Sequence, residues 1–141
     1  MPSRRKAREC ALQMLFQWDL GKDPPELVEE LFWSNTRQME DETLRRFATE
    51  LFRGAAAAID EIDPLIREHA EHWRLERMAA VDRNILRLGI YELTHCRETP
   101  PVVVINEALE IARKFSDEES VHFINGILDA IRKQIETPHP A

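Results

Sequence analysis

Four cationic side chains crowd the first two turns of the helix that the sequence predicts at its start: Arg4, Arg5, Lys6 and Arg8. The positive end of the helix dipole lies there, so each cation should cost about a few tenths of a kcal/mol where an acid would help. A sequence that accepts such a cost usually gains a function. We therefore expect a docking site for an anionic polymer, because arginines can grip phosphates through paired hydrogen bonds. The alternative is a solvated, frayed terminus.

One aromatic and two acidic residues are further candidates for binding. Phe123 falls about 100° from the centre of the apolar stripe on its predicted helix, so it should lie exposed or at an edge. There it could stack on an unpaired base, which is worth about 1–3 kcal/mol per base. The alternative is a phenylalanine at the edge of the core. Glu76 and Asp82 flank a short connection and could face a basic protein; the alternatives are a solvated acid and an ordinary helix cap.

Catalytic and metal-binding patterns have little support. The sequence has only four glycines, no phosphate-binding loop and no nucleophile motif. His69 and His72 share one helix face but lack a third ligand nearby, and His95 beside Cys96 is equally weak. Helix capping explains the acidic run at residues 117–119. We expect no enzymatic activity, no metal and no cofactor.

The charge is distributed unevenly along the 141 residues. The net charge is −7, and because the four N-terminal cations contribute +4, the remainder carries −11. An acidic body excludes general coating of DNA but permits a local contact with phosphates. The two cysteines, Cys10 and Cys96, look like small buried hydrophobes. Without an apolar run of membrane-spanning length or a signal peptide, we expect a soluble cytoplasmic protein with no membrane partner.

Helical periodicity runs along most of the chain. Ser3 is a candidate cap for a first helix that ends near Leu20, where Gly21 should stop it. Asp23 should cap a second helix, which begins with two prolines. A third helix should start near Asp41 and run to about residue 62, with a thin side at residues 54–58 for close packing of a neighbour. Residues 63–64, Asp-Pro, should cap a fourth helix.

The second half continues in the same way. A well-covered central helix should begin near Val81, with Asp82 as its candidate cap. Residues 102–105 would suggest a strand by composition, but their helical spacing with residues 108–115 favours a helix. Residues 116–119, Ser-Asp-Glu-Glu, form a capping box that opens the last helix. The sequence therefore predicts an all-α domain of about seven helices in two packed bundles, with halves at about 1–75 and 76–136.

Four segments resemble the NusB family of transcription antitermination factors. The opening Arg4–Gln13 is similar to the family's arginine-rich start, and Val81–Arg87 with Tyr91–Leu93 is similar to its central helix. Residues Val104–Ala108 and Ser120–Asp129 match its last two helices. The resemblance covers essentially the whole chain, although residues 22–75 match in pattern only.

This resemblance implies an RNA-binding adaptor that pairs with a small-subunit ribosomal protein, NusE. The pair would bind the single-stranded boxA element of ribosomal RNA leaders, with other Nus factors and RNA polymerase, and promote read-through of terminators. The resemblance implies roles for these residues: Arg4, Arg5, Lys6 and Arg8 on phosphates, Phe123 next to the RNA, His122 where a lysine is common, Glu119 at an acidic position linked to antitermination, and Glu76 and Asp82 toward the ribosomal protein. Phe16 stands where the family is expected to have a tyrosine.

Other interpretations predict different behaviour. A related helical domain occurs in ribosomal RNA cytosine methyltransferases, but a methyltransferase needs a cofactor-binding α/β domain that this sequence lacks. A helix-turn-helix regulator is disfavoured by the acidic balance and by the lack of a basic recognition helix. A scaffold that binds only protein would show no salt-dependent RNA binding. A homodimer is also possible, because basic and acidic faces on one molecule can attract each other.

Overall fold

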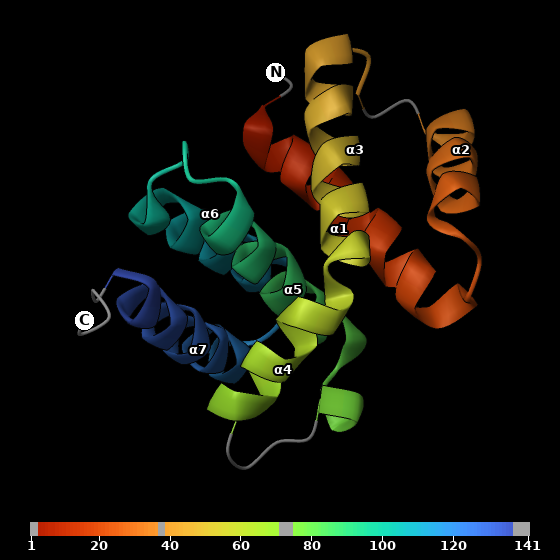
Figure 1. The fold of residues 1–141 in the computed structure, drawn as a ribbon. Coiled ribbons are helices and arrows are strands. Elements are labelled where there is room, and N and C mark those ends of the chain that lie inside the picture. The colour runs from red at the N-terminus through yellow and green to blue at the C-terminus, as the bar shows by residue number, and fades with distance from the viewer. Residues whose placement is uncertain (1–2, 37–38, 71–74, 137–141) are drawn as a thin grey trace.

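The computed structural model describes residues 3–36, 39–70 and 75–136, and in these ranges the chain is helical with no strand (Figure 1). The elements are α1 (Arg4–Gly21), α2 (Pro25–Asn35), α3 (Glu42–Ala57), α4 (Ile59–His69), the short 3₁₀ helix η1 (Leu75–Arg77), α5 (Ala80–His95), α6 (Pro101–Phe115) and α7 (Glu118–Glu136). The predicted all-α class is confirmed, and residues 102–105 lie within α6. None of the described helices is long and apolar enough to cross a membrane.

The helices enclose one connected apolar core. Helix α1 packs on α3 and α5, while α5, α6 and α7 pack on one another, and α4 lies against α5 and α7. Figure 1 shows α2 at the outer edge beside α1 and α3, with α6 and α7 on the opposite side. The largest fully buried side chains come from both halves of the chain, among them Phe52, Met14, Ile66, Leu86 and Ile124. Division of the chain at about residue 75 stays a prediction.

Helix α1 has a defined cap at each end. The Ser3 side chain accepts a hydrogen bond from the Lys6 backbone N–H at 3.2 Å, as predicted for a cap. At the other end the predicted stop is wrong by one residue, because Gly21 is still helical. Lys22 takes the left-handed conformation, with φ of 64°, and its N–H bonds to the Trp18 carbonyl at 3.4 Å.

Two other predicted caps are also wrong. Pro24, not Asp23, precedes α2 and supplies no side-chain cap. Helix α3 starts at the predicted place, with Asp41 as its cap, but it ends at Ala57, so the stripe that continues to Ile62 belongs to two helices. Pro64 lies inside α4 and does not begin it. The apolar stripe hid this break because Ile62 remains fully buried on the far side of it.

A glycine permits close contact between α3 and α5. A Cβ atom added at Gly54 would collide with the Oη and Cζ atoms of Tyr91. No side chain fits in that space unless the tyrosine ring moves. Gly54 therefore provides the thin side predicted for this helix, and it does so where the N-terminal helices meet the central helix α5.

Candidate nucleic-acid and partner interface

The N-terminal cations differ in exposure because α1 packs on its neighbours from its first turns. Arg4 and Arg5 are exposed and Lys6 is half-buried, whereas Arg8 is only 4% exposed. The Arg4 guanidinium lies over the Phe47 ring of α3, with its Cζ 4.6 Å from the ring centroid. This cation–π contact orients Arg4 at the surface and leaves its charge in place.

Arg5 is held by a carboxylate on α6. Its Nε and Nη2 donate to the two Glu107 oxygens at 2.7 and 3.1 Å. The hydrogen bonds and charge of Arg5 hold the pKa of the Glu107 carboxyl below its ordinary value. This bidentate geometry uses one edge of the guanidinium, so the Nη1 edge remains available to a second anion. Arg5 is thus fixed in direction and can still bind a phosphate.

Arg8 has a different environment from the one predicted. Its Nε and Nη2 donate to the Glu92 carboxylate of α5 at 2.7 and 2.9 Å, and the side chains are only 5% and 3% exposed. The Arg8 Cζ also lies 5.3 Å from the centroid of the Phe47 ring. In this arrangement Arg8 joins α1 to α5 beneath the surface. It is not placed for the direct phosphate contact that the sequence suggested.

A lysine from α6 lies beside the N-terminal cations. Lys114 Nζ lies 2.9 Å from Glu9 Oε1, and Lys6 Nζ lies 3.7 Å from the same oxygen. Glu9 is buried, while the Lys114 side chain is 55% exposed. We call Arg4, Arg5, Lys6 and Lys114 the cationic surface. Sequence reasoning missed Lys114, because nothing local indicates that the end of α6 lies beside the start of α1.

A groove of about 390 Å³ lies where α5, α7 and the segment before α5 meet. Its lining residues, which we call the acidic groove, are Arg77, Met78, Ala79, Asp82, Asp117, Glu119, Ser120 and Phe123. The lining contains three carboxylates and one arginine, so the groove favours a cationic or hydrogen-bond-donating ligand. The structure thus brings together Asp82, Glu119 and Phe123, which are up to 41 residues apart in sequence.

Asp82 forms part of the groove wall and does not cap α5. It lies in the first turn after Ala79, is 8% exposed, and accepts hydrogen bonds from the Ser116 and Ser120 hydroxyls, both at 2.7 Å. These bonds tie α5 to the start of α7. Ser116 does not cap α7 but is the C-terminal cap of α6, where its backbone N–H bonds to the Ala112 carbonyl. Asp117 caps α7 by accepting from the Ser120 backbone N–H at 2.8 Å. This bond from Ser120 lowers the pKa of the Asp117 carboxyl.

Two of the remaining predicted site residues, Phe123 and Glu119, line the groove. Phe123 is partly buried, packed against the core, and also lines the groove, which agrees with an edge position. Glu119 and His122 are exposed on α7. Glu76 is exposed in η1, next to the groove residue Arg77, and its Oε1 accepts from Arg67 Nη2 at 3.0 Å.

Two further histidines in the described part of the chain have side-chain partners. His69 Nε2 lies 3.1 Å from Gln134 Oε1, and His95 Nε2 lies 3.0 Å from Glu61 Oε1. His72 lies outside the described residues. Across residues 3–36, 39–70 and 75–136, no cluster of three or more histidine, cysteine or acidic side chains could hold a metal ion. Phe16, which was compared with a family tyrosine, is 37% exposed on α1.

Comparisons with known proteins agree with this arrangement. The family model described as the NusB family matches residues 5–133. The transcription antitermination protein NusB of Koribacter versatilis is 55% identical over 95% of this chain and 91% of its own length, and that of Solibacter usitatus is 50% identical over 99% and 94%. Among solved structures, T. maritima NusB is 36% identical with a TM-score of 0.84, covering 94% of this chain and 92% of that one.

A second solved structure places a similar chain in a complex. It contains the antitermination factors NusB and NusE with double-stranded RNA; the matching chain is 30% identical, with a TM-score of 0.84, and the match covers 93% of this chain and 96% of that one. The sequence identities, the coverage and the shared helical architecture lead to one conclusion: this chain belongs to the NusB family.

Proposed function

We propose that this protein is a transcription antitermination factor that binds RNA together with a ribosomal protein of the NusE type. The observation that carries this proposal is the position of the cationic surface at the start of α1, on a chain otherwise strongly acidic, in a NusB-family fold. The complex of NusB and NusE with RNA supports it, because the NusB chain there shares this fold. The protein acts by binding alone, in the cytoplasm, without a catalytic step, metal or cofactor.

The RNA ligand is single-stranded boxA RNA from ribosomal RNA leaders. Arg4, Arg5 and Lys6 supply charge for phosphates, with Lys114 extending the same surface from α6. Phe123, at the edge of α7, provides a ring on which an unpaired base can stack. About three to four phosphate contacts give a salt slope of about −2 to −3 for a single strand, so affinity should fall about 20- to 60-fold for a fourfold rise in salt.

The protein partner binds at the acidic groove. Glu119, Asp82 and Asp117 give the groove a negative potential, and exposed Glu76 lies beside it. A net charge of −7 would steer a basic ribosomal protein toward this chain. The two binding events should reinforce each other, because RNA held by both proteins contacts a larger combined surface. Other Nus factors and RNA polymerase then complete the antitermination complex.

Binding measured by fluorescence anisotropy tests the proposal. Labelled boxA RNA, a scrambled strand and the same sequence in a duplex are titrated with and without the NusE-type protein. We expect boxA affinity in the ternary complex to exceed either binary affinity by at least tenfold. Equal affinity for the scrambled strand would contradict specific recognition. If the duplex binds more tightly than the single strand, the ligand is double-stranded RNA and not single-stranded RNA.

A charge-matched pair of variants tests the cationic surface. The triple variant Arg4→Gln, Arg5→Gln and Lys6→Gln should lose most RNA affinity and flatten the salt dependence. The control removes the same charge at Arg53, Arg132 and Lys133, which pair with acids on α2 and within α7. If both triples weaken RNA binding equally, net charge and not the cationic surface governs binding. If wild type binds no RNA and binds only protein, the scaffold alternative is correct.

A further inference from the structure

One wall of the acidic groove is a segment with little regular structure of its own. Residues 75–79 contain η1, a single 3₁₀ turn in which the Met78 N–H bonds to the Leu75 carbonyl at 3.3 Å. One such turn is weak, because its hydrogen-bond geometry is poor and few residues share it. Yet Arg77, Met78 and Ala79 all line the groove, and Glu76 is exposed beside them. The groove wall therefore needs support from elsewhere.

Arg83 of α5 supplies that support through the backbone. Its Nη1 donates to the Leu75 carbonyl at 3.2 Å and to the Met78 carbonyl at 3.3 Å, which are the two ends of the turn. Its Nε and Nη2 donate to Asp19 Oδ2 at 3.0 and 2.6 Å. One guanidinium thus joins the groove wall to the C-terminal part of α1. No lysine could make this bridge, because its ammonium lacks the planar fork of donors.

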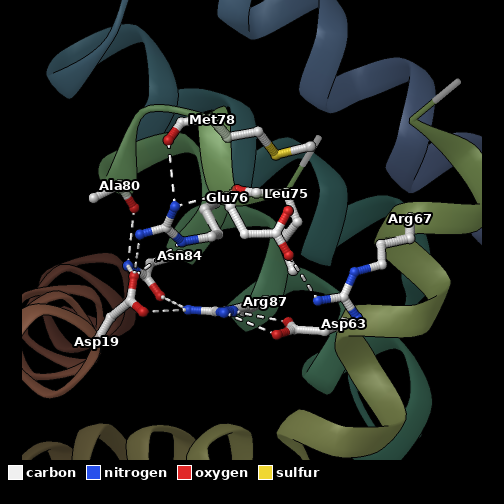
Figure 2. Close-up of polar contacts among 10 residues, drawn as sticks. Asp19, Asp63, Arg67, Leu75, Glu76, Met78, Ala80, Asn84 and Arg87 are labelled. Carbon is white, nitrogen blue, oxygen red and sulfur yellow. Dashed lines mark hydrogen bonds and ion pairs between the residues drawn. The ribbon is translucent and has the colours of Figure 1, made fainter. Parts of the chain in front are cut away.

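Asp19 is itself held firmly in place. Asn84 Nδ2 donates to Asp19 Oδ2 at 3.1 Å, and Arg87 Nη1 lies 3.1 Å from Asp19 Oδ1. Arg87 in turn makes a bidentate pair with Asp63 of α4 at 2.9 and 2.8 Å. Figure 2 shows Asp19, Asn84, Arg87 and Asp63 following one another across three helices. Arg83 is therefore braced by a network that spans α1, α4 and α5.

A second tie holds the same segment from the side. Arg67 of α4 donates to the Glu76 carboxylate at 3.0 Å, as Figure 2 shows beside Leu75 and Met78. Both side chains of this pair are more than half exposed, so solvent screens it and its contribution is small. The Arg83 side chain, by contrast, is 12% exposed. The buried tie is the one that can fix the position of the segment.

We propose that Arg83 is a positioning residue for the partner-binding groove: it holds the backbone of residues 75–78 so that Arg77 and Glu76 keep the geometry the partner protein recognises. The inference rests on the proposed function and deepens it. Because Arg83 is almost buried, it acts through the segment and has little surface with which to touch the partner. The RNA-binding cations lie at the other end of α1, and Phe123 stands on α7, outside the segment that Arg83 holds. RNA binding by the chain alone should therefore not depend on this arginine.

The test combines hydrogen exchange with partner binding in the full chain. In Arg83→Gln, we expect the peptide containing residues 75–79 to exchange at least tenfold faster, since the Leu75 carbonyl that accepts from the Met78 N–H is no longer held. Affinity for the NusE-type protein should fall about tenfold, while boxA affinity without the partner should stay within twofold. Arg83→Lys, which keeps the charge but not the fork, should give intermediate values.

Arg53→Gln is the matched control. Like Arg83, Arg53 pairs with carboxylates of another helix, here Glu26 and Glu29 of α2, and its hydrogen bonds go to these two acids and not to the groove wall. Because these pairs are largely exposed, Arg53→Gln should change stability little, and it should leave exchange at residues 75–79 and partner affinity unchanged. If wild type binds the partner and Arg83→Gln binds equally well, or no worse than Arg53→Gln, the positioning role is overturned while the proposed function stands. If wild type itself does not bind the partner, the proposed function fails and the groove role fails with it. Should Arg83→Gln not fold, the same comparison is made with Arg83→Lys.

Discussion

The buried pair between Arg8 and Glu92 gives the sharpest test of how the N-terminal cations are used. Their side chains are 5% and 3% exposed and share two hydrogen bonds, so each ion has the other as its directly hydrogen-bonded counter-charge. Breaking a buried pair by removing one partner costs about 3–5 kcal/mol, because the remaining charge stays desolvated. Replacing both by apolar residues of similar volume is often close to neutral.

We therefore expect a strongly non-additive double-mutant cycle. Arg8→Met and Glu92→Leu should each lower the free energy of unfolding by about 3–5 kcal/mol. At about 4 °C per kcal/mol for a chain of this size, each single variant should lose about 12–20 °C in Tm. The double variant should lose only about 1–2 kcal/mol. Urea unfolding followed by circular dichroism supplies the four free energies of the cycle.

RNA binding by the double variant then separates support from contact. If Arg8 only joins α1 to α5, the double variant keeps wild-type RNA affinity, whereas Arg5→Met, at the exposed cation, weakens it. Arg5→Met should also change stability far less than Arg8→Met, since water screens its pair with Glu107. Additive losses in the cycle would refute the buried-pair reasoning. A folded double variant that loses RNA affinity as Arg5→Met does would return Arg8 to the contact role.

Three further predictions concern single sites. Gly54→Ala should lower the free energy of unfolding by about 1–3 kcal/mol because the new Cβ collides with the Tyr91 ring. Adding Tyr91→Leu to this variant should recover part of the loss. Equal stability of Gly54→Ala and wild type in urea would contradict the close contact. Burial opposes ionisation of Asp19, but hydrogen bonds from basic and amide groups outweigh burial and hold the Asp19 pKa below 3.8. The stability that ionised Asp19 contributes is therefore present above about pH 4 and is lost as the pH falls through its folded-state pKa. Acid unfolding of Asp19→Asn should accordingly be less steep than that of wild type, and identical profiles would count against this linkage. Burial raises the pKa of Cys96 from 9.0 to about 11, so iodoacetamide should alkylate it about a hundredfold more slowly at pH 8 in the native than in the urea-unfolded protein; similar rates would show that the thiol is not shielded.

Local sequence signals were sufficient for most of the fold. The apolar stripe of α7 predicted buried positions at Val121, Ile124 and Leu128, and all three are buried. The same spacing identified α6 as a helix despite its run of β-branched residues. Ser3 caps α1 as predicted, and Asp41 lies at the predicted start of α3, because a helix start depends only on a few neighbouring residues. The break at Ala58 escaped notice because alanine carries no capping signal, while Asp63 and Pro64 imitate a helix start.

The site depended on pairs that no local pattern contains. Arg8 and Glu92 are 84 residues apart, and Asp82 finds its serine hydroxyls 34 and 38 residues away. Sequence reasoning places charged residues in solvent by default, since few of them are buried. That default is right for Arg4 and Arg5 and fails for Arg8 and Asp82. Only the tertiary structure shows which carboxylates and cations bury each other.

The arrangement of α1 predicts how mutations in the gene will behave, because the helix carries three cations of the cationic surface at one end and Asp19 near the other. A substitution that tilts or shifts this helix displaces both ends at once. Loss-of-function alleles in its buried face, at Met14 for example, should therefore score as defective for both ligands. Alleles that separate the two phenotypes should map to its tips, with Arg5 impairing one phenotype and Asp19 the other.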